Sequence, residues 1–517
     1  MLSPSVVTPL VTYTASITLS ILQSSNNFFV DNNLSNLDNL SDKGSHSNFT
    51  AQQYGPDSIY DNLLEETERE NWLGDWQKRI RVEVDQTDII DLLSDFQALV
   101  YLSNSSGLNN DDVSCVFDEL QSDVNRKKIA VTTSDGITQC YVEVEKWNDV
   151  NQQAWLWVKV PNISNTSDTI LYLYYDVGHV DNTDYVGDPN STPAENVWDS
   201  NFKLVTHMGD DPDTYHIRDS TLNDNDGTKE WPNAPIQADG KIGNAQDFNV
   251  IISDHVNCGT SSSLDIRYTL TIEAWIKPDS LSAVHQNSIV DRGSSYWFFV
   301  FTDGTLAFLR FKGSFGAFGT TATIPTGTFT HVAVTYDNSS LDEVKLYING
   351  ELSREGSLDG PIDSSASTVT LGDRANAHPF DGIIDEVRIS GEVINAAWIK
   401  ANYESERDDL LDFGSEESLP YELDLEVQWT NVDYSEANEE LCLYGGTMGS
   451  ENIRVDVWSG GAWQNLFTDL NTGWNNATVS SYLTSSTFTI RFKGSIETGD
   501  AIQDSWNIDA ALLHVWS

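Results

Sequence analysis

The feature that most constrains this chain is the alternation of apolar and polar residues, which recurs along most of its 517 residues. A period of two places the apolar side chains on one face of a strand, so each such run predicts a half-buried β-strand. Gly, Asn, Asp and Ser separate the runs, as is typical of turns. Clear runs occur at 80–84, 272–276, 344–348, 423–429 and 488–492. We therefore predict an all-β chain of tandem antiparallel β-sandwiches or jelly rolls.

Helical spacing is clear at only one place, where apolar residues recur three to four positions apart at Ile394, Ala397, Trp398 and Ala401.

Acidic runs at 65–71 and 404–419 suggest boundaries between domains. The first segment is too short for a core of its own, so its strands are expected to complete the C-terminal sandwich, with the middle modules inserted. An independent N-terminal arm is the alternative. The predicted domains are 1–29 (strand or leader), 30–71 (part of a discontinuous sandwich), 72–200 (sandwich), 201–403 (jelly roll), 404–419 (acidic linker) and 420–517 (sandwich).

The charge balance excludes several classes of partner. Lys and Arg number 28 against 79 Asp and Glu, for a net charge of −51. Such a surface repels nucleic acid and anionic lipid, and attracts cations.

No run of apolar residues is long enough for a transmembrane segment. No basic residue precedes Lys43, so a signal peptide is not predicted at this start.

The cysteines are too few for a disulfide scaffold. They stand at 115, 140, 258 and 442. Cys115 and Cys140 fall in one module and could pair if their strands adjoin. No CxxC pair or Cys/His cluster occurs in the sequence, so zinc is not expected.

Six motifs in 201–403 follow one another in an order and spacing that resemble a laminin-G-like (concanavalin A-like) jelly-roll module. They are 219–228 (DSTLNDNDGT), 240–248 (GKIGNAQDF), 270–278 (LTIEAWIKP), 330–336 (THVAVTY), 344–350 (VKLYING) and 380–389 (FDGIIDEVRI). Most of them pair an alternating strand with a Gly or Asp turn, which fits two curved sheets packed face to face.

The preceding segment, 72–200, resembles a domain of unknown function that often precedes laminin-G-like modules in archaeal surface proteins. The matching stretches are 76–82 (WQKRIRV), 128–136 (KIAVTTSDG), 154–161 (AWLWVKVP), 169–175 (TILYLYY) and 196–199 (NVWD). This resemblance implies a β-sandwich without known chemistry. The stretches 42–49 (DKGSHSNF) and 504–510 (DSWNIDA) resemble pieces of one archaeal β-sandwich extension.

No motif for nucleophilic, nucleotide-dependent or zinc-dependent catalysis is present. Asp385 and Glu386 are the nearest candidates for a glycosidase pair, but adjacent residues on a regular strand point to opposite faces. Glu386 shares its face with Arg388, which predicts an ion pair at the surface. We therefore expect no catalytic residues, and keep an extracellular glycosidase as an alternative.

Calcium is the expected cofactor, because hard cations take oxygen ligands from Asp and Asn side chains in loops. The resemblance implies that calcium is held near two such places in the laminin-G-like module. The candidate ligands are Asp219, Asn223, Asn225, Asp226, Asp381 and Asp385. The alternative is that these residues only shape turns. A weaker acidic set comprises Asp31, Asp38, Asp42 and Asp509.

Sugar binding requires exposed aromatic side chains with polar neighbours. Trp231, Trp463 and Trp474 are the candidates, because they lie near Gly, Pro or Asn. The apolar run 296–301 is instead expected in the core. We predict a non-catalytic extracellular or cell-surface protein that binds glycans or surface proteins in adhesion. The alternative is a self-assembling structural subunit of a surface layer, filament or virus particle.

Overall fold

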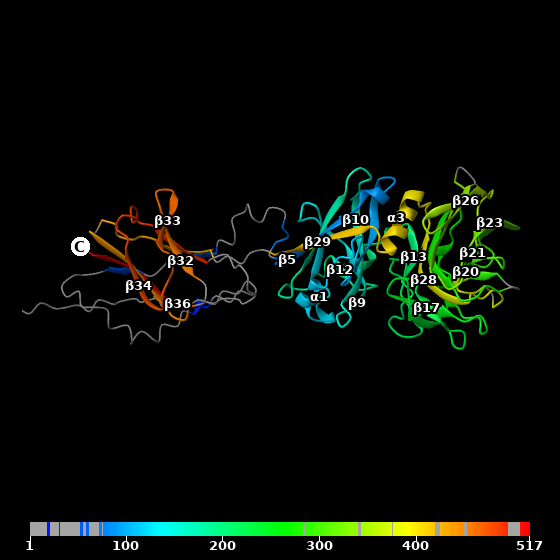
Figure 1. Cartoon of the computed structure of the whole chain (residues 1–517), viewed down its shortest axis with the longest axis horizontal. Helices are drawn as coiled ribbons and strands as arrows, with labels where there is room; N and C mark the ends of the chain where they lie inside the picture. Colours follow the sequence, from blue (N-terminus) through cyan, green and yellow to red (C-terminus); the bar gives the residue numbers. More distant parts are fainter. Residues whose placement is uncertain are drawn as a thin grey trace, which may run out of the picture. The chain divides into compact units, whose positions relative to one another are not determined.

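The computed structural model describes residues 72–74, 76–282, 286–339, 343–374, 376–418, 424–435, 437–448, 452–494 and 507–516, with four short strands before residue 62. Strands dominate, and the chain divides into two compact units (Figure 1). One unit combines 1–70 with 419–517, and the other spans 71–418. We call them the terminal unit and the central unit. Both are β-sandwich structures, which confirms the predicted fold class. No helix in the described residues is long and apolar enough to cross a bilayer.

The first module of the central unit is a sandwich of two sheets whose strands pair antiparallel, apart from the parallel pair of β12 and β9. One sheet has the order β12-β9-β10-β6 and the other β29-β5-β11-β7-β8. The apolar residues of both sheets meet in one core that includes Val82, Phe96 and Val158. The strands are β5 (Lys78–Val84), β6 (Leu93–Leu102), β7 (Ile129–Thr133), β8 (Gln139–Cys140), β9 (Val142–Asn148), β10 (Gln153–Ile163), β11 (Thr169–Tyr175), β12 (Val186–Gly187) and β29 (Leu411–Ser418).

Strand β29 comes from the segment 404–419, which the sequence analysis treats as an acidic linker. Its residues Leu411 and Phe413 are buried in the core of the first module. Its acidic residues face basic ones on β5: Glu417 pairs with Arg79 at 2.7 Å, and Glu416 lies 3.5 Å from Lys78. The acidic run is therefore the charged end of a strand. The second module is inserted between β12 and this closing strand of the first.

The second module is a jelly roll of two eight-stranded sheets. One follows β16-β17-β28-β19-β24-β25-β26, with β13 on β28, and the other follows β14-β15-β18-β27-β20-β21-β22-β23. The run 296–301 supplies the wholly buried strand β21, as predicted. The strands are β13 (Phe202–Thr206), β14 (His216–Ile217), β15 (Gly227–Lys229), β16 (Ile236–Asp239), β17 (Asn244–Phe248), β18 (Val256–Asn257), β19 (Thr269–Pro278), β20 (Asn287–Asp291), β21 (Tyr296–Val300), β22 (Thr305–Phe311), β23 (Phe315–Thr323), β24 (Thr330–Asp337), β25 (Glu343–Ile348), β26 (Glu351–Ser357), β27 (Thr370–Leu371) and β28 (Gly382–Ser390).

Helix α3 (Ala396–Glu406) is the helix that the sequence spacing predicts. Asn395 caps it, because its side chain accepts a hydrogen bond from the N–H of Trp398 at 2.9 Å. Its Ala397 and Ala401 pack into the core of the first module, whereas Ile399 packs against the second. The helix thus lies between the two modules, as Figure 1 also shows. The remaining helices are short: α1 (Cys115–Leu120), α2 (Thr192–Glu195), and the 3₁₀ turns η2 (Gln86–Asp88), η3 (Asp123–Asn125) and η4 (Ser262–Leu264).

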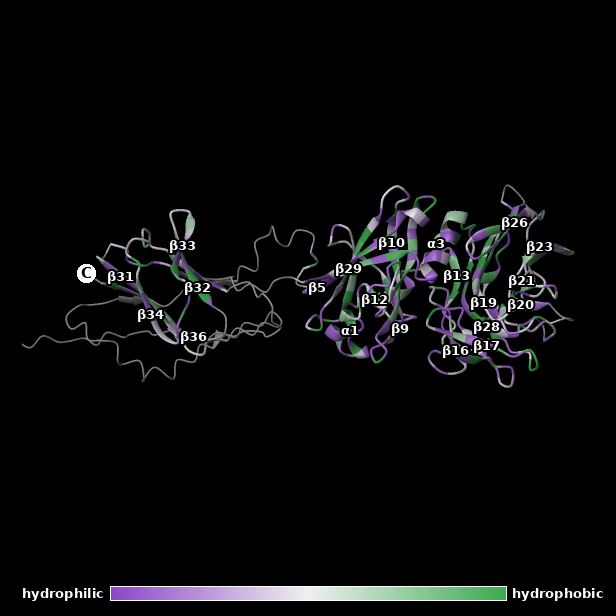
Figure 2. Ribbon diagram, in the orientation of Figure 1, coloured by the Kyte–Doolittle hydropathy of each residue, from purple (hydrophilic) through white to green (hydrophobic). Residues whose placement is uncertain are grey.

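The terminal unit is a sandwich that draws strands from both ends of the chain. Its sheets have the orders β2-β1-β36-β31-β34, with β3 on β36, and β33-β32-β35-β30-β4. Apolar residues concentrate on the strands and hydrophilic ones in the loops (Figure 2). The strands are β1 (Thr18–Ser20), β2 (Val30–Asp31), β3 (Gln52–Tyr54), β4 (Ser58–Asp61), β30 (Asp424–Trp429), β31 (Asn438–Gly445), β32 (Ile453–Ser459), β33 (Ala462–Phe467), β34 (Gly473–Thr478), β35 (Phe488–Gly494) and β36 (Asn507–Trp516).

Candidate functional site

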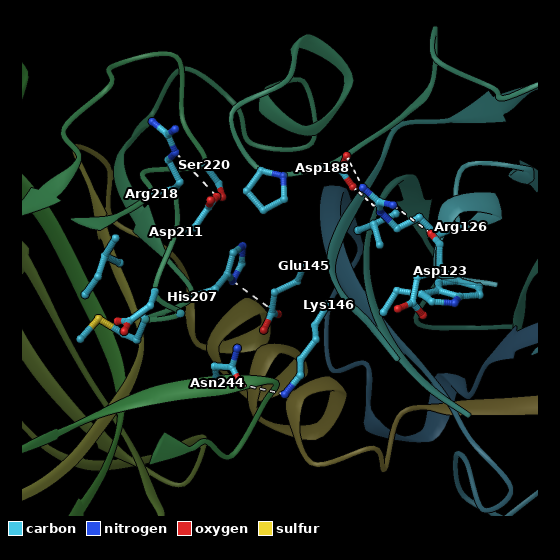
Figure 3. Close-up of a pocket in the computed structure, with 17 residues that line it drawn as sticks. Asp123, Arg126, Glu145, Lys146, Asp188, His207, Asp211, Arg218, Ser220 and Asn244 are labelled. Atoms are coloured by element: carbon cyan, nitrogen blue, oxygen red, sulfur yellow. Dashed lines mark hydrogen bonds and ion pairs between the residues drawn. The ribbon is translucent and has the colours of Figure 1, made fainter. Parts of the chain in front are cut away.

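A polar pocket opens where the two modules of the central unit meet. Its volume is about 480 Å³, within the range of small-molecule sites. The first module contributes side chains from β9 and from loops, and the second contributes the segment after β13 and the start of β17 (Figure 3). The labelled lining residues are Asp123, Arg126, Glu145, Lys146, Asp188, His207, Asp211, Arg218, Ser220 and Asn244.

Paired charges fix the walls of this pocket. The guanidinium of Arg126 donates two hydrogen bonds to Asp188, at 2.7 and 2.9 Å. Across the pocket, Lys146 of β9 donates to the side-chain oxygen of Asn244 at 2.7 Å, which ties the two modules together. The two parallel hydrogen bonds between Arg126 and Asp188 hold both side chains in one geometry. The walls therefore present donors and acceptors at fixed positions.

His207 lies at the base of the pocket among three carboxylates. Its Nδ1 is 2.8 Å from Glu386 and 3.6 Å from Glu145, and its Nε2 is 3.4 Å from Glu143. Glu143 and Glu145 share a face of β9 because they are two residues apart. Burial by itself lowers the pKa of His207, but the charges of Glu386, Glu145 and Glu143 outweigh burial and hold it well above its ordinary value. His207 is therefore a buried cation.

The carboxylates around His207 differ in charge. Burial raises the pKa of Glu145 to about 8, against the attraction of His207. Burial acts on Glu386 in the same sense, but His207 and Arg388 reverse its effect and lower the pKa of Glu386. Glu145 is thus the carboxyl that keeps a proton near neutral pH, and Glu386 is ionised. Opposed shifts of this kind occur at catalytic pairs and also in structural networks.

Arg388 extends the cluster away from the pocket, beneath helix α3. It contacts Glu386 at 3.0 Å and Glu406 at 2.6 Å. Trp157 donates its indole N–H to Glu145 at 2.8 Å, and Trp198 donates to Glu143 at 2.6 Å. We call the residues Glu143, Glu145, His207, Glu386, Arg388 and Glu406 the junction cluster; all six are buried or nearly so.

The junction cluster corrects one prediction of the sequence analysis. Glu386 and Arg388 do form an ion pair, but their side chains are only 1% and 3% exposed. In the structure the pair lies on the outer face of a jelly-roll sheet, since the neighbouring Val387 and Ile389 belong to the core. The first module and α3 cover that face. Glu386 also has a left-handed φ of 46°, where β28 is irregularly paired with β19. The regular-strand geometry assumed for Asp385 and Glu386 therefore does not apply.

Four of the six predicted calcium ligands share the loop after β14, where they hydrogen-bond to the protein itself. The buried carboxylate of Asp219 accepts from the N–H groups of Val205, Thr221 and Asn225 at 2.9–3.0 Å. Burial raises the pKa of Asp219 to about 6 despite these donors. Asp226 accepts from the N–H of Asp219 and from Arg218. The amides of Asn223 and Asn225 donate to backbone carbonyls of 202 and 203.

The other two predicted ligands lie beside β28. Asp385 is fully buried and accepts from the N–H groups of Lys241 and Ile242 at 2.8 and 3.0 Å. Asp381 accepts from the hydroxyl of Ser280 at 2.5 Å. In the described residues, none of the six belongs to a compact group of potential metal ligands. Calcium binding by them stays a prediction. In the weaker acidic set, Asp38 and Asp42 lie outside the described residues, as do the side chains of Asp31 and Asp509.

The three predicted sugar-binding tryptophans have different surroundings. Trp231 is 81% exposed. In its loop, the side-chain amide of Asn233 donates a hydrogen bond to the carbonyl of Ile252 in a neighbouring loop. Trp463 is half-buried against Trp458, with Arg491 over its ring at 4.6 Å. Trp474 is half-buried against Tyr444. Only Trp231 presents a largely free ring.

Sequence reasoning missed the pocket and the junction cluster. Glu143 and Glu145 alternate with buried Val142 and Val144, so they read as ordinary solvent-facing residues of a strand. Cys115 and Cys140 are not bridged in the structure. A signal for a covered face was the concentration of Trp residues at 147, 155 and 157, close to these carboxylates in the sequence.

Two family models match parts of the chain, one within each module of the central unit. Residues 251–400 match the family model of the concanavalin A-like lectin/glucanases superfamily, and residues 125–195 match that of a domain of unknown function, DUF2341. These matches confirm the two resemblances. No curated protein matches the chain.

Several solved structures are similar to parts of the chain. Domain 4 of AbnA, a GH43 extracellular arabinanase from Geobacillus stearothermophilus in complex with arabinotriose, is 25% identical, with 39% of this chain and 98% of that chain covered and a TM-score of 0.33. The Ruminococcus gnavus IT-sialidase CBM40 bound to alpha2,3 sialyllactose is 18% identical, with coverage of 28% and 85% and a TM-score of 0.24. The binding domain of Paraclostridial Mosquitocidal Protein 1 is 13% identical, with coverage of 60% and 91% and a TM-score of 0.33.

Proposed function

We propose that this protein binds carbohydrate without catalysing its conversion, and that the pocket at the junction of the two central modules is the binding site. The observation that carries the proposal is the lining of a pocket of sugar size by fixed donors and acceptors. A sugar ring presents hydroxyl groups that both donate and accept. Such a ligand suits carboxylates, an amide and cationic side chains together better than an apolar ligand would.

Trp147 adds a donor that is not yet used. Trp147 is one of the residues that line the pocket, and its buried indole Nε1 has no hydrogen-bond partner among the described residues. Leaving a buried N–H unpaired costs free energy, about 1–3 kcal/mol. A ligand hydroxyl at this position would recover that cost. The match of residues 251–400 to the lectin/glucanase superfamily is a further support.

The junction cluster supports binding rather than hydrolysis. A catalytic acid or nucleophile has to reach the substrate. Glu386 is 1% exposed and is held by His207 and Arg388, and Glu145, which lines the pocket, is 4% exposed and is held by the indole N–H of Trp157. The cluster therefore serves as a buried network of paired charges that supports the floor of the pocket. An extracellular setting, with adhesion to glycan-bearing surfaces, is part of the same proposal, and the net charge of −51 is compatible with it.

Trp231 offers a second surface for sugar, since an exposed indole can stack on the apolar face of a sugar ring. Its loop is separate from the residues that line the pocket. The two surfaces make different predictions, so one set of variants can separate them.

The test is a glycan array with the full chain, followed by calorimetry on the strongest ligand. Asp211→Ala and Asn244→Ala each remove one polar group from the pocket wall and should weaken binding about tenfold, the value of one hydrogen bond to a ligand. Glu351→Ala is the matched control, because Glu351 is a 76% exposed carboxylate elsewhere on the same module. Trp231→Ala should bind as the unchanged protein does.

Loss of binding in Trp231→Ala alone would move the site to the loop. Failure of every glycan to bind a folded, full-length protein would overturn the proposed function.

A further inference from the structure

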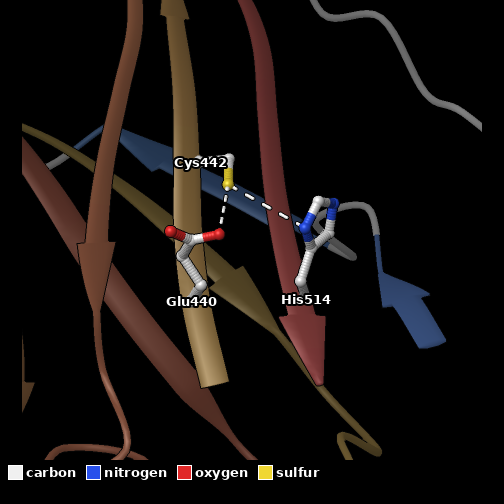
Figure 4. A group of neighbouring side chains, drawn as sticks. All are labelled: Glu440, Cys442 and His514. Carbon is white, nitrogen blue, oxygen red and sulfur yellow. Dashed lines mark hydrogen bonds between the residues drawn. The ribbon is translucent and has the colours of Figure 1, made fainter. Parts of the chain in front are cut away.

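A second group of reactive side chains lies far along the sequence from the central unit, on strands β31 and β36 of the terminal unit. Glu440 and Cys442 are two residues apart on β31, so they lie on the same face of the sheet. His514 of β36 stands directly opposite Glu440 in the strand register. Figure 4 shows all three side chains converging on one point.

This group lies on the face of the sheet opposite the hydrophobic core. Leu441 and Leu443 alternate with Cys442 on β31 and belong to the core, as do Leu513 and Val515 beside His514. The thiol of Cys442 is buried, whereas Glu440 and His514 are half-buried. A small ion can therefore approach from the side of the carboxylate and the imidazole.

The two distances from the sulfur are close to those of a tetrahedral metal site. The Sγ of Cys442 is 3.5 Å from Glu440 Oε2 and 3.9 Å from His514 Nδ1. All three ligand atoms lie within 4.8 Å of one another. With Zn–S near 2.3 Å and Zn–N or Zn–O near 2.1 Å, tetrahedral geometry requires ligand atoms about 3.6 Å apart. Small side-chain rotations would therefore bring all three ligands to bonding distance.

We propose that Glu440, Cys442 and His514 bind a borderline divalent transition-metal ion, of which Zn²⁺ is the type. A thiolate with an imidazole selects such ions over Ca²⁺ and Mg²⁺, which take oxygen ligands. On binding, the Cys442 thiol releases its proton to water and the thiolate bonds to the metal, with no change of oxidation state. Three protein ligands leave at least one coordination position for water or another donor.

The strand pairing gives the ion a structural consequence. β31 and β36 are neighbours, and β36 also pairs with β1 and β3 from the N-terminal part of the chain. An ion bridging β31 and β36 would fix the C-terminal strand on which those N-terminal strands assemble. This inference is independent of carbohydrate binding, because it concerns the other unit.

Cobalt substitution tests the proposal directly. The tag-free full chain, reduced with a non-thiol reductant, is titrated with Co²⁺ and followed by its absorption spectrum. We expect one equivalent to produce a thiolate-to-cobalt charge-transfer band that Zn²⁺ abolishes by displacement. Cys442→Ser should remove the band, and His514→Asn and Glu440→Gln should each raise the dissociation constant by at least about tenfold. Cys115→Ser, a half-buried cysteine of the central unit, is the matched control and should keep the band.

Absence of the band in the folded wild-type protein, or its persistence in Cys442→Ser, would overturn the proposal. Circular dichroism of each variant establishes that it is folded. If Cys442→Ser does not fold, the half-buried Glu440→Gln and His514→Asn decide the matter, because unchanged affinity in both would equally refute the site.

Discussion

The junction cluster and the group of Glu440, Cys442 and His514, which we call the Glu440 group, both bring carboxylate and histidine side chains close together, yet their charges are balanced differently. Glu145, His207 and Glu386 form a group as compact as Glu440, Cys442 and His514. In the junction cluster the protein supplies the cations itself, through protonated His207 and through Arg388 at 3.0 Å from Glu386. In the described residues, no lysine or arginine forms an ion pair with Glu440.

This difference indicates which group can accept an external ion. A buried carboxylate is stable only with a partner that compensates its charge. Arg388 and His207 would repel a metal ion in the junction cluster, whereas the Glu440 group carries a soft ligand, and its carboxylate pairs with no lysine or arginine in the described part of the chain. Similar geometry therefore leads to two different inferences, an internal charge network in the central unit and a metal site in the terminal unit.

Removing the internal cation should have the largest effect. Arg388→Leu leaves Glu386 and Glu406 without their shared partner, and we expect the central unit to lose about 3–5 kcal/mol of unfolding free energy. Urea unfolding gives the loss, and hydrogen exchange in β28 assigns it to the central unit. Arg81→Ala is the control, since Arg81 is 42% exposed in a surface pair with Glu83 and should cost at most about 1 kcal/mol. Equal losses in the two variants would show that the junction cluster is not stabilised by Arg388.

Supplying an external cation should have the next largest effect, and only in the terminal unit. Zinc at a hundredfold excess over its dissociation constant should raise the unfolding free energy of that unit by about 2.7 kcal/mol. Hydrogen exchange in β31 and β36 should slow on addition of zinc, while exchange in β9 and β28 should not change. Slowing in β9 would place the ion at Glu145 and His207, and would reverse the comparison.

The fold was largely predictable from the sequence, whereas the junction was not. Alternation indicated the strands, the Ile394–Ala401 spacing indicated α3, and ordered motifs identified the jelly roll, because these signals are local. The same alternation correctly places Glu143 and Glu145 outside the core of their own sandwich. It carries no information about a second module that covers that face.

The Glu440 group was missed for a related reason. Cys442 and His514 are 72 positions apart, and only the pairing register of β31 and β36 brings them together. Cys and His do not occur at the short spacings of zinc motifs in this sequence, so the sequence does not predict zinc. A register error of one residue would place His514 on the opposite face.

Raising the pH should weaken the junction cluster by an intermediate amount. Glu145 has a pKa of about 8 when folded, above the ordinary value of 4.5, so the folded state holds a proton that the unfolded chain has lost. The raised pKa of His207 acts in the same direction. Stability contributed by both groups is therefore lost as the pH rises, and we expect a loss of about 1–3 kcal/mol between about pH 6 and pH 9.

The matched variant for this pH effect is Glu145→Gln, which keeps a neutral side chain at the same position. Its melting temperature should fall less steeply with pH than that of the wild-type protein, because no proton has to leave position 145. A melting curve of the central unit that is flat over this range in the wild-type protein would contradict the raised pKa values of Glu145 and His207.

Glu440→Gln in the absence of metal should have the smallest effect. Glu440 is half-buried, and within the described part of the chain it accepts a hydrogen bond from the weakly donating thiol of Cys442 at 3.5 Å. Without a cation to lose, the amide should change the unfolding free energy of the terminal unit by no more than about 0.5 kcal/mol. The same substitution should abolish most of the stabilisation by zinc. A metal-free loss above about 1 kcal/mol would instead mean that Glu440 holds the strands together by itself, as the charged residues of the junction cluster do.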